Sequence, residues 1–95
     1  MIKELLNLPN DCLVCTFNFG DMYLKVTPYI NNIFGESYEI YDTNPKSVSQ
    51  KLISDAKNRN LNNIHLIGNK PYFSEIKKSI YTNNQEYSNL IVEVY

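Results

Sequence analysis

The sequence predicts an α/β fold, with one mixed sheet, two main helices and a short N-terminal helix in a single domain of residues 1–95. Three observations lead to this prediction. Apolar residues alternate in several short segments, which is typical of strands with two different faces. Two other segments have apolar residues at helical spacing, and each is opened by a proline. Ninety-five residues are also enough for one domain with its own core.

The N-terminal part predicts a short helix, a central strand and a tight turn. Residues 1–8 (MIKELLNL) place three aliphatic side chains on one helical face, and Pro9 ends this helix. Residues 12–19 (CLVCTFNF) are mostly apolar, as expected of a strand that is covered on both faces. Gly20 leads a two-residue connection with Asp21, which favours a type II′ turn because glycine accepts the positive φ required there.

Alternation predicts the next two strands. In residues 22–27 the odd positions, which include Tyr23 and Lys25, face away from the apolar even positions. Pro28 limits how far this strand can pair, because proline has no backbone N–H. Residues 37–41 (SYEIY) alternate in the same way, so we expect a third strand at an edge of the sheet.

The second half of the chain predicts a helix, a strand, a second helix and a last strand. Asn44 can accept hydrogen bonds from the first free amides of a helix that begins at Pro45. Pro71 opens the second helix, and Lys77 and Lys78 are expected near its carboxyl end, where cations are favoured. The expected apolar faces are Val48, Leu52, Ile53 and Ala56 in the first helix and Tyr72, Phe73, Ile76 and Ile80 in the second. The two remaining strands are residues 64–67 (IHLI) and 90–95 (LIVEVY).

These elements predict the spatial strand order 3-2-1-4-5. The first three strands are antiparallel neighbours because short turns join them. Right-handed crossovers through the helices carry the fourth strand past the hairpin and place the fourth and fifth parallel to the first. The prediction is therefore a mixed sheet with helices packed on it.

Composition and charge narrow the classes of function. Nine basic and ten acidic residues give a formal charge of −1, which disfavours nonspecific binding to a phosphate backbone. The apolar runs are too short to span a bilayer, and the N-terminus does not resemble a signal peptide, so we expect a cytoplasmic protein without membrane contact. Fourteen asparagines and eight lysines against one arginine are typical of an AT-rich genome, which indicates a source and not an activity. Because small proteins of this kind are common in AT-rich bacteria and their phages, we expect an inhibitor or assembly protein of a phage or mobile element.

The two cysteines form a Cys12-x-x-Cys15 spacing that can mark a redox pair or half of a zinc site. Strand residues follow this pair, and positions three apart in a strand point to opposite faces. We therefore interpret both as buried free thiols. A metal site formed by Cys12, Cys15 and His65 is the alternative. His65 itself lies in a short apolar strand, where a hydrogen-bonded interior histidine is the favoured interpretation.

The element order, together with Asn18-Phe19-Gly20 and Lys25 on the next strand, resembles the ribonuclease-H-like superfamily of nucleases, resolvases and actin-like ATPases. In that superfamily the first strand carries an aspartate, often followed by glycine and a hairpin. The resemblance implies this fold and, for its catalytic members, a metal-dependent reaction that clustered carboxylates support. The actin-like ATPases hold nucleotide between two such domains, and this chain supplies one.

The chain departs from that pattern at the positions that matter for catalysis. Asn18 occupies the place of the first carboxylate, and an amide brings no charge to a hard cation. The fourth strand offers no second acid. If the chain processes nucleic acid with a metal ion, Asp21, Asp42 and Glu75 are the remaining candidate catalytic residues. This resolvase-like activity stays open as the alternative function.

The favoured function is a noncatalytic protein-binding or assembly module, such as an adaptor, an inhibitor or a structural subunit. Eight tyrosines exceed the needs of a small core, and tyrosine is favoured at protein interfaces because it buries area with little loss of side-chain entropy. We expect a protein partner rather than a nucleic acid, no cofactor, and a homodimer formed through the last strand at the sheet edge. The candidate binding residues are Tyr23, Lys25, Tyr41, Ile91 and Tyr95.

Overall fold

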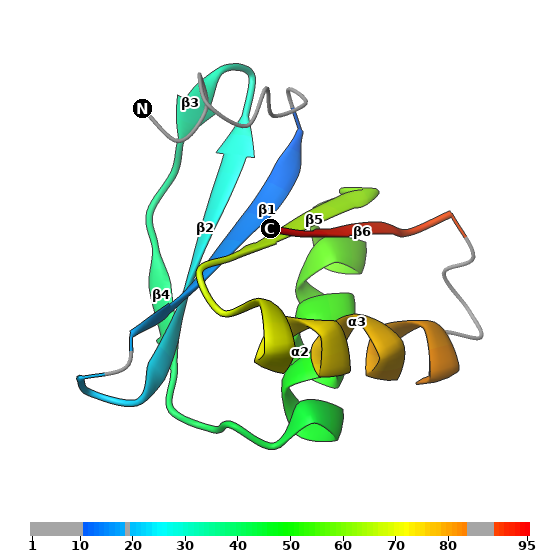
Figure 1. Cartoon of the computed structure of the whole chain (residues 1–95). Helices are drawn as coiled ribbons and strands as arrows, with labels where there is room; N and C mark the ends of the chain where they lie inside the picture. Colours follow the sequence, from blue (N-terminus) through cyan, green and yellow to red (C-terminus); the bar gives the residue numbers. More distant parts are fainter. Residues whose placement is uncertain (1–10, 19, 84–88) are drawn as a thin grey trace.

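The computed structural model describes residues 11–18, 20–83 and 89–95, which form one mixed sheet and two helices (Figure 1). The elements are β1 (Cys12–Asn18), β2 (Tyr23–Ile30), β3 (Ile33–Phe34), β4 (Tyr38–Ile40), α2 (Pro45–Asn58), β5 (Asn63–Ile67), α3 (Lys70–Asn83) and β6 (Ile91–Val94). The strand order is β3-β2-β1-β5-β6, and β4 pairs with β2. β1 and β2 are antiparallel, whereas β1, β5 and β6 are mutually parallel. The predicted fold class and strand order are confirmed. The predicted helix at residues 1–8 lies outside the described residues.

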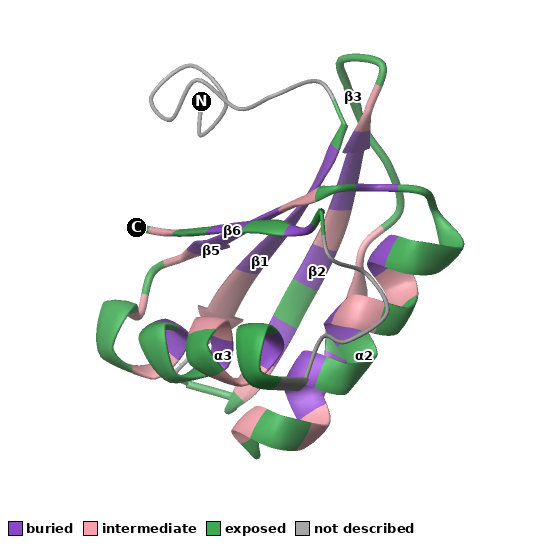
Figure 2. Ribbon diagram, turned by 90° about the vertical axis from the view of Figure 1, so that its right-hand side faces the viewer, coloured by how far each residue is buried: buried purple, intermediate pink, exposed green. Residues whose placement is uncertain are grey.

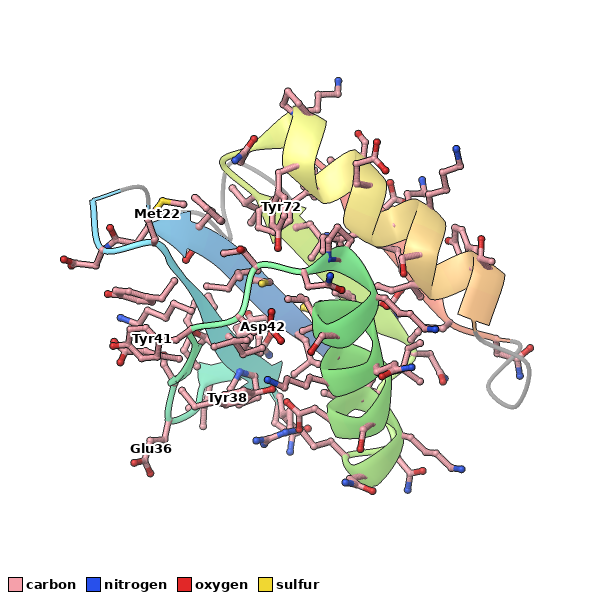
Figure 3. All side chains as sticks on the ribbon, turned by 90° about the horizontal axis from the view of Figure 1, so that it is seen from below. Met22, Glu36, Tyr38, Tyr41, Asp42 and Tyr72 are labelled. Carbon is pink, nitrogen blue, oxygen red and sulfur yellow. The ribbon has the colours of Figure 1, made fainter. Side chains whose placement is uncertain are left out.

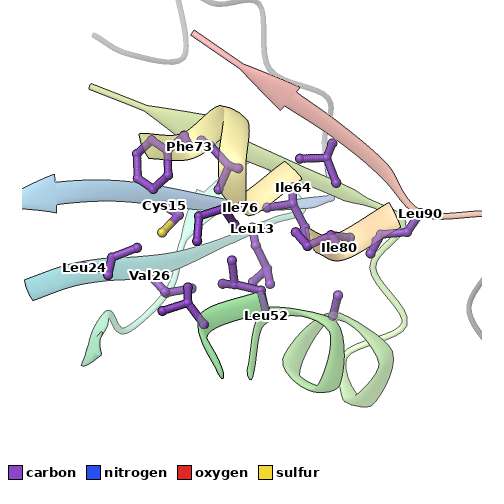
Figure 4. Close-up of a cluster of buried hydrophobic side chains, with 14 of the residues drawn as sticks. Leu13, Cys15, Leu24, Val26, Leu52, Ile64, Phe73, Ile76, Ile80 and Leu90 are labelled. Carbon is purple, nitrogen blue, oxygen red and sulfur yellow. The ribbon is translucent and has the colours of Figure 1, made fainter. Parts of the chain in front are cut away.

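Both helices pack on the same face of the sheet and bury the main core. Ser49 of α2 and Ser79 of α3 join the helices through their hydroxyl groups, whose oxygen atoms lie 2.9 Å apart. Figure 4 shows the core between these helices and the strands, and Figure 2 shows the exposed outer faces of the helices. Fully buried members of the core include Leu13, Leu24, Val26, Leu52, Ile64, Phe73, Ile76 and Ile80. The predicted helical faces are thus confirmed, with Ile53 and Tyr72 packed at the margin of the core.

The turn between β1 and β2 differs from the prediction. Asn18 pairs with Tyr23, so four residues connect the strands instead of the two-residue Gly20-Asp21 turn. The Asn18 side chain organises this loop, because its Oδ1 accepts a hydrogen bond from the Asp21 backbone N–H at 3.0 Å. Met22, the last residue of this loop, has a positive φ of 55°. The type II′ prediction was wrong because an asparagine side chain stabilises a longer loop with a left-handed last residue.

A second hairpin, which the sequence interpretation missed, joins β2 to β3. Asn31 and Asn32 have φ angles of 54° and 65°, and Ile30 pairs with Ile33 directly across the turn. Two consecutive residues with positive φ are characteristic of a type I′ turn, which suits the right-handed twist of paired strands. Asparagine tolerates this conformation better than most residues do. The Asn31-Asn32 dipeptide therefore begins a short strand that precedes the predicted edge strand.

The edge strand beside β2 is split by a bulge opposite Pro28. The pairs that flank the bulge are Val26–Tyr38 and Tyr29–Phe34. Two residues of β2 lie between these pairs, against three of the edge strand. The Pro28 carbonyl accepts a hydrogen bond from the Gly35 N–H at 2.8 Å, so the missing N–H of Pro28 also points at this break. β2 therefore continues past Pro28 to Ile30 instead of ending before it.

Helix α2 has the predicted start and a well-formed end. The Asn44 side chain accepts hydrogen bonds from the Lys46 and Ser47 amides at 3.0 and 3.1 Å, and Pro45 is the first helical residue. At the other end Asn60 has a φ of 58°, and the Leu61 N–H donates to the Ala56 carbonyl at 2.8 Å. This pattern is a Schellman motif, in which asparagine takes the left-handed position that glycine usually occupies.

Helix α3 begins one residue earlier than predicted and ends later. Asn69 caps it: the Asn69 carbonyl accepts from the Phe73 N–H at 2.8 Å, and its side chain accepts from the Tyr72 N–H at 3.3 Å. The helix runs to Asn83, so Lys77 and Lys78 lie before its last turn and the prediction that they stabilise its carboxyl end was wrong. In the part of the chain that the structure describes, neither helix is long and apolar enough to cross a membrane.

Candidate binding surface

The face of the sheet opposite α2 and α3 holds all five residues that the sequence proposed for binding. Leu24 and Val26 of β2 point into the helix-covered core, so their neighbours Tyr23 and Lys25 project from the other face. Pairing extends this face outward, because Lys25 lies opposite Glu39. On β6, Val92 is buried on the helix side, and the odd residues project from the other side. We call this surface the helix-free face, because neither of the two described helices covers it. Its proposed binding residues are Tyr23, Lys25, Tyr41, Ile91 and Tyr95.

An aromatic pair marks one end of the helix-free face. The rings of Tyr23 and Tyr41 lie 5.3 Å apart between centroids and are tilted by 45°. Tyr41 is 68% exposed, and its hydroxyl donates to Glu39 Oε1 at 2.8 Å. This hydrogen bond, with smaller effects of desolvation and nearby negative charge, raises the pKa of Tyr41. Figure 3 shows Tyr41 on the side of β4 away from α2. The pair thus offers apolar ring surface with polar groups at its rim.

The edge strand β6 contributes the other part of the helix-free face. Ile91 is 51% exposed and Tyr95 is 37% exposed. His65 on the neighbouring β5 is buried, and its Nδ1 lies 2.8 Å from the Tyr95 hydroxyl. The two rings stack at 5.5 Å between centroids. Burial lowers the pKa of His65, and the nearby Glu93 carboxylate partly offsets this effect. The prediction of a hydrogen-bonded interior histidine is confirmed, and His65 holds the Tyr95 ring in place.

The two parts belong to one surface but do not touch. β2 and β6 are separated by β1 and β5 in the strand order. Three strand spacings of about 4.8 Å place their backbones roughly 14 Å apart. Thr16 of β1 and Ile67 of β5 lie between them in register and are partly exposed. A protein contact of ordinary size could cover both parts at once.

The two cysteines lie on opposite faces of β1, as predicted. Cys15 belongs to the main core under the helices, whereas Cys12 packs with Val14 and Tyr29 on the other face. Both side chains are buried, and the two cysteines are not joined in a disulfide. Desolvation raises the pKa of Cys12 to about 11, with a smaller contribution from Asp11, and it raises the pKa of Cys15 to about 12. Because Cys15 faces away from His65, the alternative site of two thiolates and this histidine does not form.

The acids proposed for metal-dependent chemistry have other surroundings. Asp42 accepts hydrogen bonds from the Asn44 N–H at 2.9 Å and from the Ser47 hydroxyl, beside the first turn of α2 (Figure 3). The Ser47 bond, followed by the backbone bond, lowers the pKa of Asp42. Asp21 lies in the β1–β2 loop, and Glu75 lines a shallow pocket between the two helices. Within residues 11–18, 20–83 and 89–95, no three histidine, cysteine, aspartate or glutamate side chains are placed to hold a metal ion.

Several exposed apolar residues escaped the sequence interpretation. Ile33 and Phe34 of β3 are 67% and 46% exposed, and Met22 is 53% exposed. A pocket of about 470 Å³ opens beside Ile33 and the bulge at Gly35. The Asn31-Asn32 turn was the available signal for β3. Tyr81 of α3 is also exposed by about half, and its hydroxyl accepts a hydrogen bond from the Val92 N–H at 3.1 Å.

Comparison with known proteins adds no family to this description. No protein-family model matches the chain, and no curated protein has a significantly similar sequence. The geometry of the described residues therefore carries the functional argument alone.

Proposed function

We propose that this chain is a noncatalytic protein-binding or assembly module that uses the helix-free face and the adjoining edge of β6. The observation that carries the proposal is the exposure of Tyr41 and Ile91, at 68% and 51%, on the face that neither described helix covers. Exposed aromatic and aliphatic groups with polar groups around them are typical of protein contact sites. Tyrosine is also a frequent source of binding energy there.

Charge favours a protein partner over a nucleic acid. Lys25 is the basic residue among the five proposed binding residues, and Glu39 and Glu93 share its face. The whole chain carries a formal charge of −1. Nucleic-acid affinity depends on several cations that neutralise phosphates, and this surface does not concentrate them. This near-neutral surface does not repel a protein partner.

The chemistry of the described side chains supports a binding role over a catalytic one. The thiols of Cys12 and Cys15 are buried and protonated at neutral pH. Asp42 is engaged at the start of α2, and the Asn18 amide organises the β1–β2 loop. We infer that this is an adaptor or inhibitor that acts in the cytoplasm. A distant kinship with the ribonuclease-H-like superfamily is part of the same proposal, and the strand order of the mixed sheet supports it.

Affinity capture with matched variants tests the binding face. The tagged protein, the double variant Tyr23→Ser with Tyr41→Ser, and the control Ile33→Ser are incubated with lysate of the source cells, with and without nuclease. Ile33 is a suitable control because it is an exposed apolar residue whose neighbour Ile30 packs on the helix side. We expect one discrete protein that survives nuclease, is retained by Ile33→Ser, and is weakened at least about tenfold by the double variant, as loss of 1.4 kcal/mol or more would produce.

The captured partner is then purified and its affinity for each folded variant is measured by calorimetry. Equal affinities for the wild type and the double variant would contradict the proposed face. Retention of nucleic acid, or partners that disappear on nuclease treatment, would instead favour the resolvase-like alternative and direct mutagenesis to Asp21, Asp42 and Glu75.

A further inference from the structure

The edge of β6 has backbone groups that point away from the sheet. β6 bonds to β5 through its odd residues: the Ile91 N–H donates to the Asn62 carbonyl at 2.7 Å, and the Tyr95 N–H donates to the Leu66 carbonyl at 2.9 Å. In a strand the neighbouring residues direct their backbone groups to the opposite side. The Val92 N–H therefore points outward, where a further strand would bind it.

A side chain from α3 already occupies this position. The Tyr81 hydroxyl accepts the hydrogen bond of the Val92 N–H at 3.1 Å. The preceding residue, Ile80, is fully buried in the main core and fixes this part of α3 against β6. Lys77, one turn earlier, places its Nζ 5.9 Å from the centre of the Tyr81 ring. Tyr81 thus reaches from the helix to the outer edge of the sheet.

An added strand and the Tyr81 hydroxyl cannot bind Val92 at the same time. A paired strand lies about 4.8 Å away and places its carbonyl oxygen about 2.9 Å from the N–H nitrogen. The Tyr81 oxygen, at 3.1 Å from the same nitrogen, occupies that location. A single N–H does not make two well-aligned hydrogen bonds, so the tyrosine must turn away before a strand can pair there.

We propose that Tyr81 closes the edge of β6, and that a second copy of this chain pairs with β6 only when Tyr81 turns away. This inference rests on the edge pairing in the proposed function and adds its control. A second copy suits this edge because an antiparallel pair centred on Val92 sets Ile91 opposite the partner's Glu93 and keeps the two carboxylates apart. A pair centred on Glu93 would oppose like charges, which destabilises a sheet. The formal charge of −1 per chain adds little repulsion between copies.

The variant Tyr81→Phe tests the proposal because it removes the hydroxyl and keeps the ring. The control is Tyr72→Phe, which removes another hydroxyl from α3. The Tyr72 hydroxyl donates to the Thr43 carbonyl at 2.8 Å, and Thr43 is far in sequence from β6. Two measurements are made: amide hydrogen exchange of Val92 by NMR in dilute protein, and the dimer dissociation constant by sedimentation over a wide range of concentration.

The expected effects follow from one hydrogen bond per chain. Loss of a net hydrogen bond of about 1 kcal/mol makes exchange at Val92 about fivefold faster in Tyr81→Phe. Each dimer needs two tyrosines to turn away, so the dimer dissociation constant falls on the order of 25-fold, which is fivefold for each chain. Tyr72→Phe changes neither quantity, although it lowers stability.

Each other outcome has a definite meaning. Unchanged exchange at Val92 in Tyr81→Phe would show that the hydroxyl does not close the edge, and would overturn the proposal. Faster exchange with both proteins monomeric at every concentration would overturn pairing with a second copy. Neither result bears on the aromatic end of the helix-free face, which the capture experiment with Tyr23 and Tyr41 tests separately.

Discussion

Replacing Tyr38 by phenylalanine removes a single hydroxyl that ties the edge strand β4 to helix α2. That hydroxyl donates to Asp55 Oδ2 at 2.5 Å, and the other oxygen of Asp55 accepts from Arg59 Nε at 2.6 Å. The ring of Tyr38 packs against the main core, and the Asp55 side chain is only 17% exposed. Burial, and then the bond to Asp55, raise the pKa of Tyr38, so the phenol remains a donor at any ordinary pH.

The expected cost can be worked out from this geometry. A hydrogen bond to a charged group contributes about 1.5–3 kcal/mol net. Asp55 keeps its ion pair with Arg59 in the variant, so its charge is not left without a partner. We therefore expect Tyr38→Phe to lower the free energy of unfolding by about 2 kcal/mol, in the lower half of that range. For a domain of this size, that loss lowers Tm by roughly 8–16 °C.

Urea unfolding, followed by circular dichroism, measures the loss, and an unchanged m value shows that the change is one of stability alone. The matched control is Tyr41→Phe, which also removes a tyrosine hydroxyl bonded to a carboxylate, at 2.8 Å from Glu39, but at an exposed site. Water competes for an exposed contact of this kind, so we expect Tyr41→Phe to lose clearly less stability than Tyr38→Phe. If the two variants lose the same amount of stability, the assignment of a semi-buried, charge-assisted link between β4 and α2 is wrong.

Three further predictions concern the helix start, the histidine and the thiols. Asn44→Ala removes the cap of α2 and should lower the free energy of unfolding by about 1 kcal/mol in thermal melts, whereas Asn44→Asp should retain most of it. Burial depresses the pKa of His65 in the folded state, so the unfolded chain takes up the proton first as the pH falls. The free energy of unfolding should therefore fall as the pH is lowered through about 6.5, the usual pKa of histidine. A His65→Gln variant should show a flatter dependence of this free energy on pH. The raised pKa values of Cys12 and Cys15 predict that Ellman's reagent labels both thiols in denaturant and neither in the native protein at pH 8, and rapid native labelling would contradict their burial.

Local sequence signals predicted helix α2 and the strand faces well because the chemistry behind them is local. Asn44 and Pro45 define the helix start by hydrogen bonding and by a fixed φ angle, and neither depends on the rest of the fold. The two-residue period of a strand placed Tyr23 and Lys25 together on one face without any knowledge of what covers it. The strand order followed because right-handed crossovers leave few arrangements for these elements.

The errors arose where side chains or distant strands decide the backbone. The Gly20-Asp21 dipeptide favours a tight turn, but the Asn18 side chain bonds to the Asp21 N–H and stabilises a loop of four residues. Pro28 looked like the end of a strand because a proline breaks pairing on one side. At the bulge beside Gly35 the edge strand does not require a hydrogen bond from an N–H at position 28. The missing N–H of Pro28 therefore costs no pairing there, and β2 continues. Such compensation between strands has no signature in the local sequence.

The edge of β6 shows why an exposed strand predicted from sequence need not be available for pairing. The pattern of residues 90–95 predicted an outer strand, but the Val92 N–H is bonded to Tyr81, which lies eleven residues earlier on a helix. Removal of the strand by truncation at Asn89 would not isolate its role, because Leu90 and Val92 are buried in the main core and the helices would lose that cover. Removal of one hydroxyl at Tyr81 leaves the core intact and changes only the edge. The two changes should therefore have opposite effects on association. Truncation should unfold the domain and so prevent association, whereas Tyr81→Phe should promote the association of a folded domain.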